Sequence, residues 1–120
     1  MRIAVPVENI EEMDSRVSAH FGRAVGFVIY DDETKGLESV SNTSEHMGGK
    51  GKPPELIENS DVDLVLCSNL GRRAVDMFNK MGIDVCVGAS GTVKDVLKAW
   101  NEGKLSQADS NNVCTQHHTR

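Results

Sequence analysis

Aromatic residues are scarce in this sequence, and long apolar runs and an excess of positive charge are missing. One Trp, one Tyr and three Phe among 120 residues mean that the core is built mainly of aliphatic side chains. No stretch approaches the roughly 20 apolar residues needed to cross a bilayer, and the N-terminus lacks the apolar run of a signal peptide. We therefore expect a cytoplasmic protein without a membrane partner. The net charge of −5 repels nucleic acid, which argues against a DNA- or RNA-binding protein.

Cysteines are few and widely spaced, at positions 67, 86 and 114, and no CxxC pair occurs. In a reducing compartment such an odd set indicates free thiols or metal ligands and not a disulfide framework. Cys86 lies inside an apolar run and is expected to be a core residue. Cys67 lies at the end of another apolar run, where it can be either a small buried residue or a ligand.

Short apolar runs separated by turn signals predict an α/β protein. Three strands are expected at 2–8, 24–32 and 36–42, the last two joined by a hairpin turn, with Pro6 where the first strand begins to leave the sheet. A βαβα alternation follows, with a helix start at 53–60, strands at 62–68 and 83–88, and helices at 70–82 and 92–103. The order βββαβαβα predicts a five-stranded mixed sheet with strand order 3-2-1-4-5. We expect one domain over residues 1–105 and a flexible polar tail over 106–120.

The helix ends carry their own signals. Asn69 and Thr92 are candidate N-caps, and Gly82 and Gly103 stand where C-terminal glycines belong. In the predicted sheet, the carboxyl ends of strands one, three, four and five meet at one edge, which is where open α/β sheets bind ligands. Both later helices should point their N-termini, with unpaired N–H groups, at this edge.

Candidate ligands gather at the same edge. His20 lies in the loop after strand one, His46 follows strand three, and Cys67 ends strand four, while Arg72 and Arg73 open the next helix. Imidazole and thiolate are ligands that iron, molybdenum and copper prefer, and the arginines favour an anionic cluster. The alternative is structural: His20 can hydrogen-bond a loop carbonyl, and Cys67 can be a buried core residue.

Two further segments are open to either interpretation. The glycine-rich stretch HMGGKGKPPE lacks the spacing of a phosphate-binding P-loop, but Gly48, Gly49 and Gly51 could let the backbone close over an anion near His46. Otherwise it is a solvated linker. The tail places three potential metal ligands within five residues, and they can also be incidental: Cys114, His117 and His118.

The sequence resembles the dinitrogenase iron–molybdenum cofactor biosynthesis family, which includes NifX, NafY and the C-terminal part of NifB. The resemblance covers about residues 1–105 in four ordered runs, MRIAVPVE, HFGRAVGFVIYD, HMGGKGKPPELI and VDLVLCSNLGRRAVDMFNKMGIDVCVGASGTVKDVLKAWNEGKL. It implies a ribonuclease-H-like fold, a link to nitrogen fixation, and the carriage of a metal–sulfur cofactor or its precursor, of iron–molybdenum, iron–sulfur or molybdenum–copper type. His20 matches the family's HFG motif, and Gly71 matches its glycine-started helix.

From the residues and the resemblance together we expect a binding or carrier protein and not an enzyme. This carrier would exchange its cluster with donor or acceptor proteins. The expected cofactor-binding residues are His20, Gly22, Arg23, His46, Gly49, Gly71, Arg72 and Arg73. The expected metal ligands are His20, His46, Cys67, Cys114, His117 and His118.

Two other functions stay open. The chain could be a scaffold or regulatory module without a cofactor. A metal-dependent nuclease is the less favoured alternative. Its carboxylates would be Glu8, Asp61 and Asp63, of which the last two fall at the wrong end of strand four.

Overall fold

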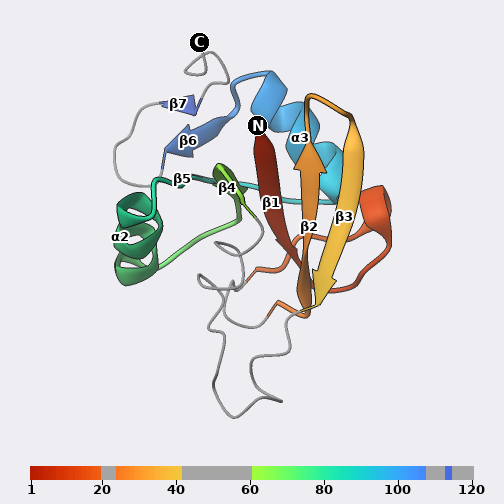
Figure 1. Cartoon of the computed structure of the whole chain (residues 1–120), viewed down its shortest axis with the longest axis horizontal. Coiled ribbons are helices and arrows are strands. Elements are labelled where there is room, and N and C mark those ends of the chain that lie inside the picture. Colours follow the sequence, from red (N-terminus) through yellow and green to blue (C-terminus); the bar gives the residue numbers. More distant parts are fainter. Residues whose placement is uncertain (20–23, 42–60, 108–112, 115–120) are drawn as a thin grey trace.

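The protein is a three-layer α/β molecule in which one sheet is covered by helices on both faces (Figure 1). The computed structural model describes residues 1–19, 24–41 and 61–107, and the backbone of residues 113–114. The helix start predicted at 53–60 lies outside these residues. Helix α2 (Arg72–Lys80) lies on one face of the sheet, and helix α3 (Val93–Asn101) on the other. In the part of the chain that the structure describes, neither helix is long and apolar enough to cross a membrane.

The sheet has the strand order β3-β2-β1-β4-β5-β6-β7, so the predicted order of the first five strands is confirmed. The strands are β1 (Arg2–Val7), β2 (Gly26–Asp31), β3 (Gly36–Ser41), β4 (Leu64–Leu66), β5 (Asp84–Val87), β6 (Leu105–Gln107) and β7 (Val113–Cys114). The prediction of five strands is wrong, because β6 and β7 extend the sheet beyond β5. These two strands have three and two residues, too few to show the alternation of apolar and polar residues that marks a strand. The division into a domain over 1–105 and a tail stays a prediction, although Ser106 and Gln107 belong to β6.

Strand directions bring four carboxyl ends to one side. β1 pairs antiparallel with β2, and β2 antiparallel with β3, so β3 runs in the direction of β1. β4 is parallel to β1, and β5 is parallel to β4. We call the side where β1, β3, β4 and β5 end the carboxyl edge, and the opposite side the amino edge. In Figure 1 the carboxyl edge is at the bottom, where β1 and β3 end.

Pro6 lies within β1, and its missing N–H costs the sheet no hydrogen bond to a neighbouring strand. The register joins Ile3 and Ala4 of β1 to β4, and β4 ends before the level of Pro6. The carbonyl of Pro6 instead accepts a hydrogen bond from the backbone N–H of Ser18 at 2.9 Å. Since N and O of one strand residue point to the same side, the missing N–H of proline faces a loop and not a neighbouring strand.

Alternating residues of the central strands divide the core in two. In β1, Ile3, Val5 and Val7 pack on the α3 side, and Ala4 packs on the α2 side. β4 is buried at all three positions, as the prediction of a strand covered on both faces requires. Phe78 anchors α2 on its side, and four residues anchor α3 on the other: Val93, Val96, Leu97 and Trp100.

The predicted helix caps are confirmed at three positions and wrong at one. Thr92 caps α3, its hydroxyl accepting from the N–H of Asp95 at 3.3 Å while the Asp95 carboxylate accepts from the N–H of Thr92 at 3.1 Å. Gly82 and Gly103 follow the helices with φ of +80° and +71°. Asn69 is not the N-cap of α2, because its side chain accepts only from the N–H of the next residue and the helix begins after Gly71.

The capping box makes part of the stability depend on pH. Hydrogen bonds from the N–H and hydroxyl of Thr92 lower the pKa of Asp95. A carboxyl whose pKa is depressed by folding stabilises the protein above its unfolded pKa, about 3.9 for Asp, and loses this effect as pH falls through the folded value. Wild type should therefore exceed Asp95→Asn in urea midpoint at neutral pH, and the gap should close in acid. An equal gap at both pH values would contradict this assignment.

Candidate functional site

Cys67 stands at the carboxyl edge directly after β4, but its thiol is buried. The residue is 1% exposed, its N–H donates to the Cys86 carbonyl at 3.0 Å, and its sulfur lies 3.7 Å from the same oxygen. Burial raises the pKa of this thiol to about 12. Metals bind the thiolate, so Cys67 in this arrangement holds the proton that a metal ligand must lose.

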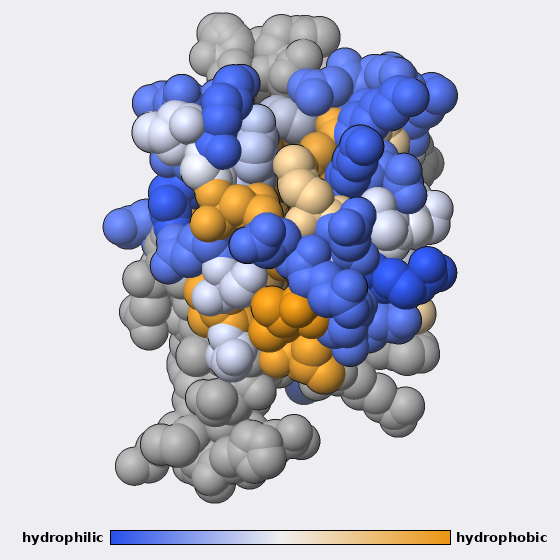
Figure 2. All heavy atoms as spheres, turned by 90° about the vertical axis from the view of Figure 1, so that its right-hand side faces the viewer, coloured by the Kyte–Doolittle hydropathy of each residue, from blue (hydrophilic) through white to orange (hydrophobic). Residues whose placement is uncertain are grey.

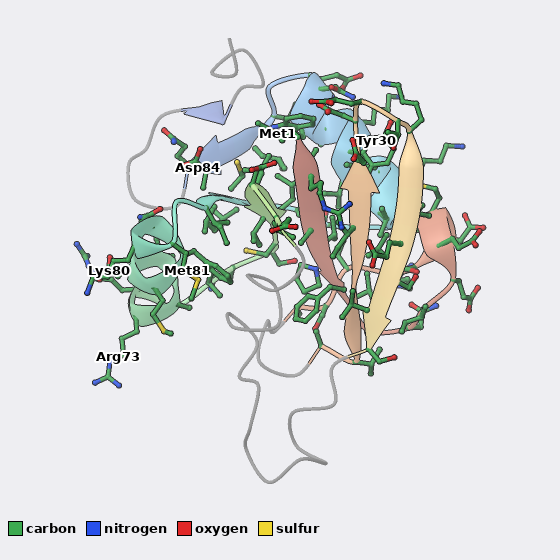
Figure 3. The ribbon with its side chains drawn as sticks, viewed as in Figure 1. Met1, Tyr30, Arg73, Lys80, Met81 and Asp84 are labelled. Atoms are coloured by element: carbon green, nitrogen blue, oxygen red, sulfur yellow. The ribbon has the colours of Figure 1, made fainter. Side chains whose placement is uncertain are left out.

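The N-terminus of α2 is open and cationic. Its N-cap, Gly71, supplies no side-chain hydrogen bond, and the first turn contains no acidic residue. The first hydrogen bond into the helix runs from the N–H of Val75 to the carbonyl of Gly71 at 3.0 Å. Arg72 and Arg73 are exposed, and Figure 3 shows Arg73 extending away from the sheet while Met81 points toward it. This end of the helix therefore combines the positive end of a dipole with two guanidinium groups.

The N-terminus of α3 differs, and the expectation that both helices offer free N–H groups is wrong for this one. Its first N–H, from Val93, donates to the carbonyl of Ser15 at 2.9 Å. Its third, from Asp95, is taken by Thr92, and the Asp95 carboxylate places a negative charge in the first turn. The N-terminus of α2 is therefore electrostatically the more favourable of the two for an anion.

The structure brings together only some of the predicted site residues. Cys67 and Gly71 lie between β4 and α2, and Arg72 and Arg73 open α2, all at the carboxyl edge. Cys114 lies in β7, of which only the backbone is described. Seven predicted residues fall outside the described residues, so their roles stay predictions: His20, Gly22, Arg23, His46, Gly49, His117 and His118. Within the described ranges, no three His, Cys, Asp or Glu side chains converge as a metal site would require.

Cys86 is buried in β5 on the α3 side, as predicted for a core residue. It is also disulfide-bonded, so the expectation of a free thiol is wrong here. Cys67 is the free cysteine of the described side chains. Sequence spacing could not show this, because pairing depends on which strands the sheet places together.

Two buried serines that the sequence analysis missed hold the loop after β1. The Ser15 hydroxyl accepts from the N–H of Glu11 at 2.6 Å, and its carbonyl caps α3. The Ser18 N–H donates to Pro6, and the N–H of Val17 donates to the Gly91 carbonyl at 2.9 Å. The described chain up to Ala19, next to His20 in the sequence, is thereby fixed against the sheet and α3. No local signal distinguishes such serines from solvated loop serines.

The carboxylates of the nuclease alternative lie at opposite edges of the sheet. Glu8 follows β1 at the carboxyl edge and is exposed. Asp63 precedes β4 at the amino edge, where its carboxylate accepts from the N–H of Arg2 at 2.9 Å. Two-metal hydrolysis needs carboxylates around one site, which this placement does not provide.

The fold and the carboxyl edge together define a class of protein. It is a small α/β protein with a mixed sheet, ribonuclease-H-like in topology, whose carboxyl edge carries a basic helix N-terminus without a side-chain cap. The model of the dinitrogenase iron–molybdenum cofactor family matches residues 1–103, and the chain belongs to this family.

Similar proteins come from several organisms. The uncharacterized protein MJ0580 of Methanocaldococcus jannaschii is 34% identical over 112 residues, which cover 89% of this chain and 91% of the relative. The apo form of the orange protein from Desulfovibrio gigas superimposes with a TM-score of 0.80 at 28% identity, over 92% of this chain and 95% of that chain. A NifB-like protein of the DUF35 family from Thermotoga superimposes with a TM-score of 0.75 at 32% identity, over 88% and 91% of the two chains.

Proposed function

We propose that this protein is a carrier, and not an enzyme, for an anionic metal–sulfur cofactor or its precursor, bound at the carboxyl edge. The observation that carries the proposal is the N-terminus of α2, which lacks a side-chain cap and an acidic residue and bears two exposed arginines. Membership of the iron–molybdenum cofactor family and relation to the orange protein and a NifB-like protein support it.

The described residues supply charge and not direct metal bonds. Gly71 leaves room for close approach, since a Cβ at this position would meet nothing within 4 Å. Arg72 and Arg73 would hold the negative charge of the cluster, together with the first-turn N–H groups, which have no side-chain cap among the described residues. Among our candidates from the sequence, His20 and His46 are the first choice for directed bonds to metal, because burial raises the pKa of the Cys67 thiol to about 12 and disfavours its thiolate.

A carrier role requires proteins that deliver and accept the cluster, and we propose such donor or acceptor proteins as partners. The negative net charge of −5 disfavours nucleic acid. A scaffold or regulatory module without cofactor is the alternative function, and a test of visible absorption distinguishes the two, since a bound metal–sulfur cluster absorbs visible light and the bare protein does not.

The test uses tetrathiomolybdate, a coloured dianion of a metal–sulfur core, titrated anaerobically into the full chain. The double variant Arg72→Gln/Arg73→Gln should bind about five- to tenfold more weakly than wild type at low salt, because each charge near a helix N-terminus contributes roughly 0.3–1 kcal/mol. The difference should shrink at high salt, where exposed charges are screened.

A matched control removes two charges elsewhere. Lys80→Gln/Lys104→Gln lowers the net charge equally but leaves the N-terminus of α2 intact. It should bind the probe as wild type does. Equal affinity of wild type and the arginine variant at low salt, or equal weakening by both variants, would reject α2 as the binding end. The absence of any retained chromophore would reject the carrier function itself.

A further inference from the structure

A cavity of about 400 Å³ opens at the amino edge, on the side of the sheet that α3 covers. Its apolar wall comes from Met13 of the short 3₁₀ helix η1 (Glu12–Asp14), Tyr30 at the end of β2, and Leu97 and Trp100 of α3. Figure 2 shows the molecule from the side of β3, where patches of apolar atoms lie among hydrophilic ones. The volume is at the small end of the range for ligand sites, about 300–1,000 Å³.

Trp100 contributes the face of its ring to this wall. The residue is 2% exposed, and its Nε1–H is buried without a partner among the described residues. Because this N–H has no accessible surface, Trp100 offers a ligand apolar contact and not a hydrogen bond.

The charged residues of the rim favour an anion. Asp32 and Glu102 are both occupied, Asp32 by the N-terminal ammonium at 3.0 Å and Glu102 by the ammonium of Lys104 at 3.0 Å. Lys35 and Lys98 also line the cavity, and the structure gives neither an ion pair within the described residues. Lys98 also lies near the carboxylates of Asp95 and Glu102, whose pKa values it helps to lower. Lys35 is therefore the less engaged of the two cations that a ligand can meet.

We propose that this cavity is a second binding site, for a small monocarboxylate with an apolar or aromatic body. The carboxylate lies against Lys35 and Lys98, and the body packs on Met13, Tyr30, Leu97 and the ring of Trp100. Figure 3 shows Tyr30 at the end of the sheet opposite to Arg73. The site is therefore separate from the N-terminus of α2, and the proposal does not depend on the cluster.

The single tryptophan gives a direct assay, since one indole N–H resonance in the nitrogen–proton NMR spectrum of the full chain reports Trp100 alone. Titration with 3-phenylpropionate should move this resonance saturably, with a dissociation constant in the micromolar to millimolar range. The uncharged amide, 3-phenylpropanamide, should bind about fivefold or more weakly, because it lacks the charge that the lysines recognise.

The lysines are tested with a matched pair of variants. Lys35→Gln/Lys98→Gln should weaken binding of the carboxylate about tenfold, whereas Lys80→Gln/Lys94→Gln, which removes two exposed lysines outside the cavity, should leave it unchanged. An indole resonance that stays fixed throughout the titration would overturn the proposal. Equal binding of the amide, or equal binding by the Lys35 and Lys98 variant, would overturn the assignment of an anion.

Discussion

Replacing Phe78 by alanine should destabilise the protein by about 3–5 kcal/mol, because the change empties a site at the centre of the core on the α2 side. Phe78 is 0% exposed and belongs to the same buried cluster as Val65 of β4 and Val85 of β5. α2 is only nine residues long, and such a helix depends on packing because its intrinsic propensity is too weak to hold it. The loss is measured by urea unfolding followed by circular dichroism.

The neighbouring residue serves as the control. Met77 lies on the same helix but is 38% exposed, so Met77→Ala should change the stability by no more than about 0.5 kcal/mol. If Phe78→Ala leaves too little folded protein to measure, Phe78→Leu should give a smaller loss in the same direction. Similar effects of the substitutions at 77 and 78 would contradict the packing of α2 described here.

Replacing Gly26 by alanine should cost about 1–3 kcal/mol, because an added Cβ has no room at the start of β2. The atom would lie 2.5 Å from the carbonyl oxygen of Val40 and 3.0 Å from the Cδ1 of Ile10. The Val40 oxygen belongs to the backbone of β3, so the two strands must separate to relieve the contact. Thermal unfolding of the variant measures the loss.

Gly71 provides the matched glycine. Its φ of −66° is ordinary for any residue, and a Cβ there would meet nothing within 4 Å. Gly71→Ala should therefore change the stability by no more than about 1 kcal/mol, because restriction of the unfolded chain stabilises the variant while alanine is a poorer N-cap than glycine. If Gly71→Ala lost as much stability as Gly26→Ala, the loss at position 26 could not be assigned to the close approach of β2 and β3.

Elements with strong local patterns were predicted from the sequence. The strands at Arg2–Val7, Gly26–Asp31 and Gly36–Ser41 lie within the expected runs, since their composition and turn signals are local. The Thr92 cap was predicted as well, because its partner Asp95 is only three residues away. The cap at Asn69 failed because the chain stays extended through Gly71 before α2 begins, which no neighbouring residue indicates.

The candidate site was predicted only in part. The carboxyl edge follows from strand order and direction, and this placed Cys67, Arg72 and Arg73 correctly at one edge. The protonation of Cys67 and the capping of the helix N-termini did not follow from the sequence. Cys67 is protonated because α2 and the sheet bury it, and the N-terminus of α3 is closed by Ser15, which is far from it in the chain.

The sequence by itself determined the types and order of the main elements and the order of the first five strands, because periodicity, turn residues and short connections act within a few residues. The tertiary structure alone decided which of two helix N-termini stays open and where a cavity forms. Both depend on residues distant in sequence: Ser15 against Val93 at one edge, and Met13, Tyr30 and Trp100 at the other. Such contacts arise only when the chain folds, because burial and charge pairing depend on what the sheet brings together.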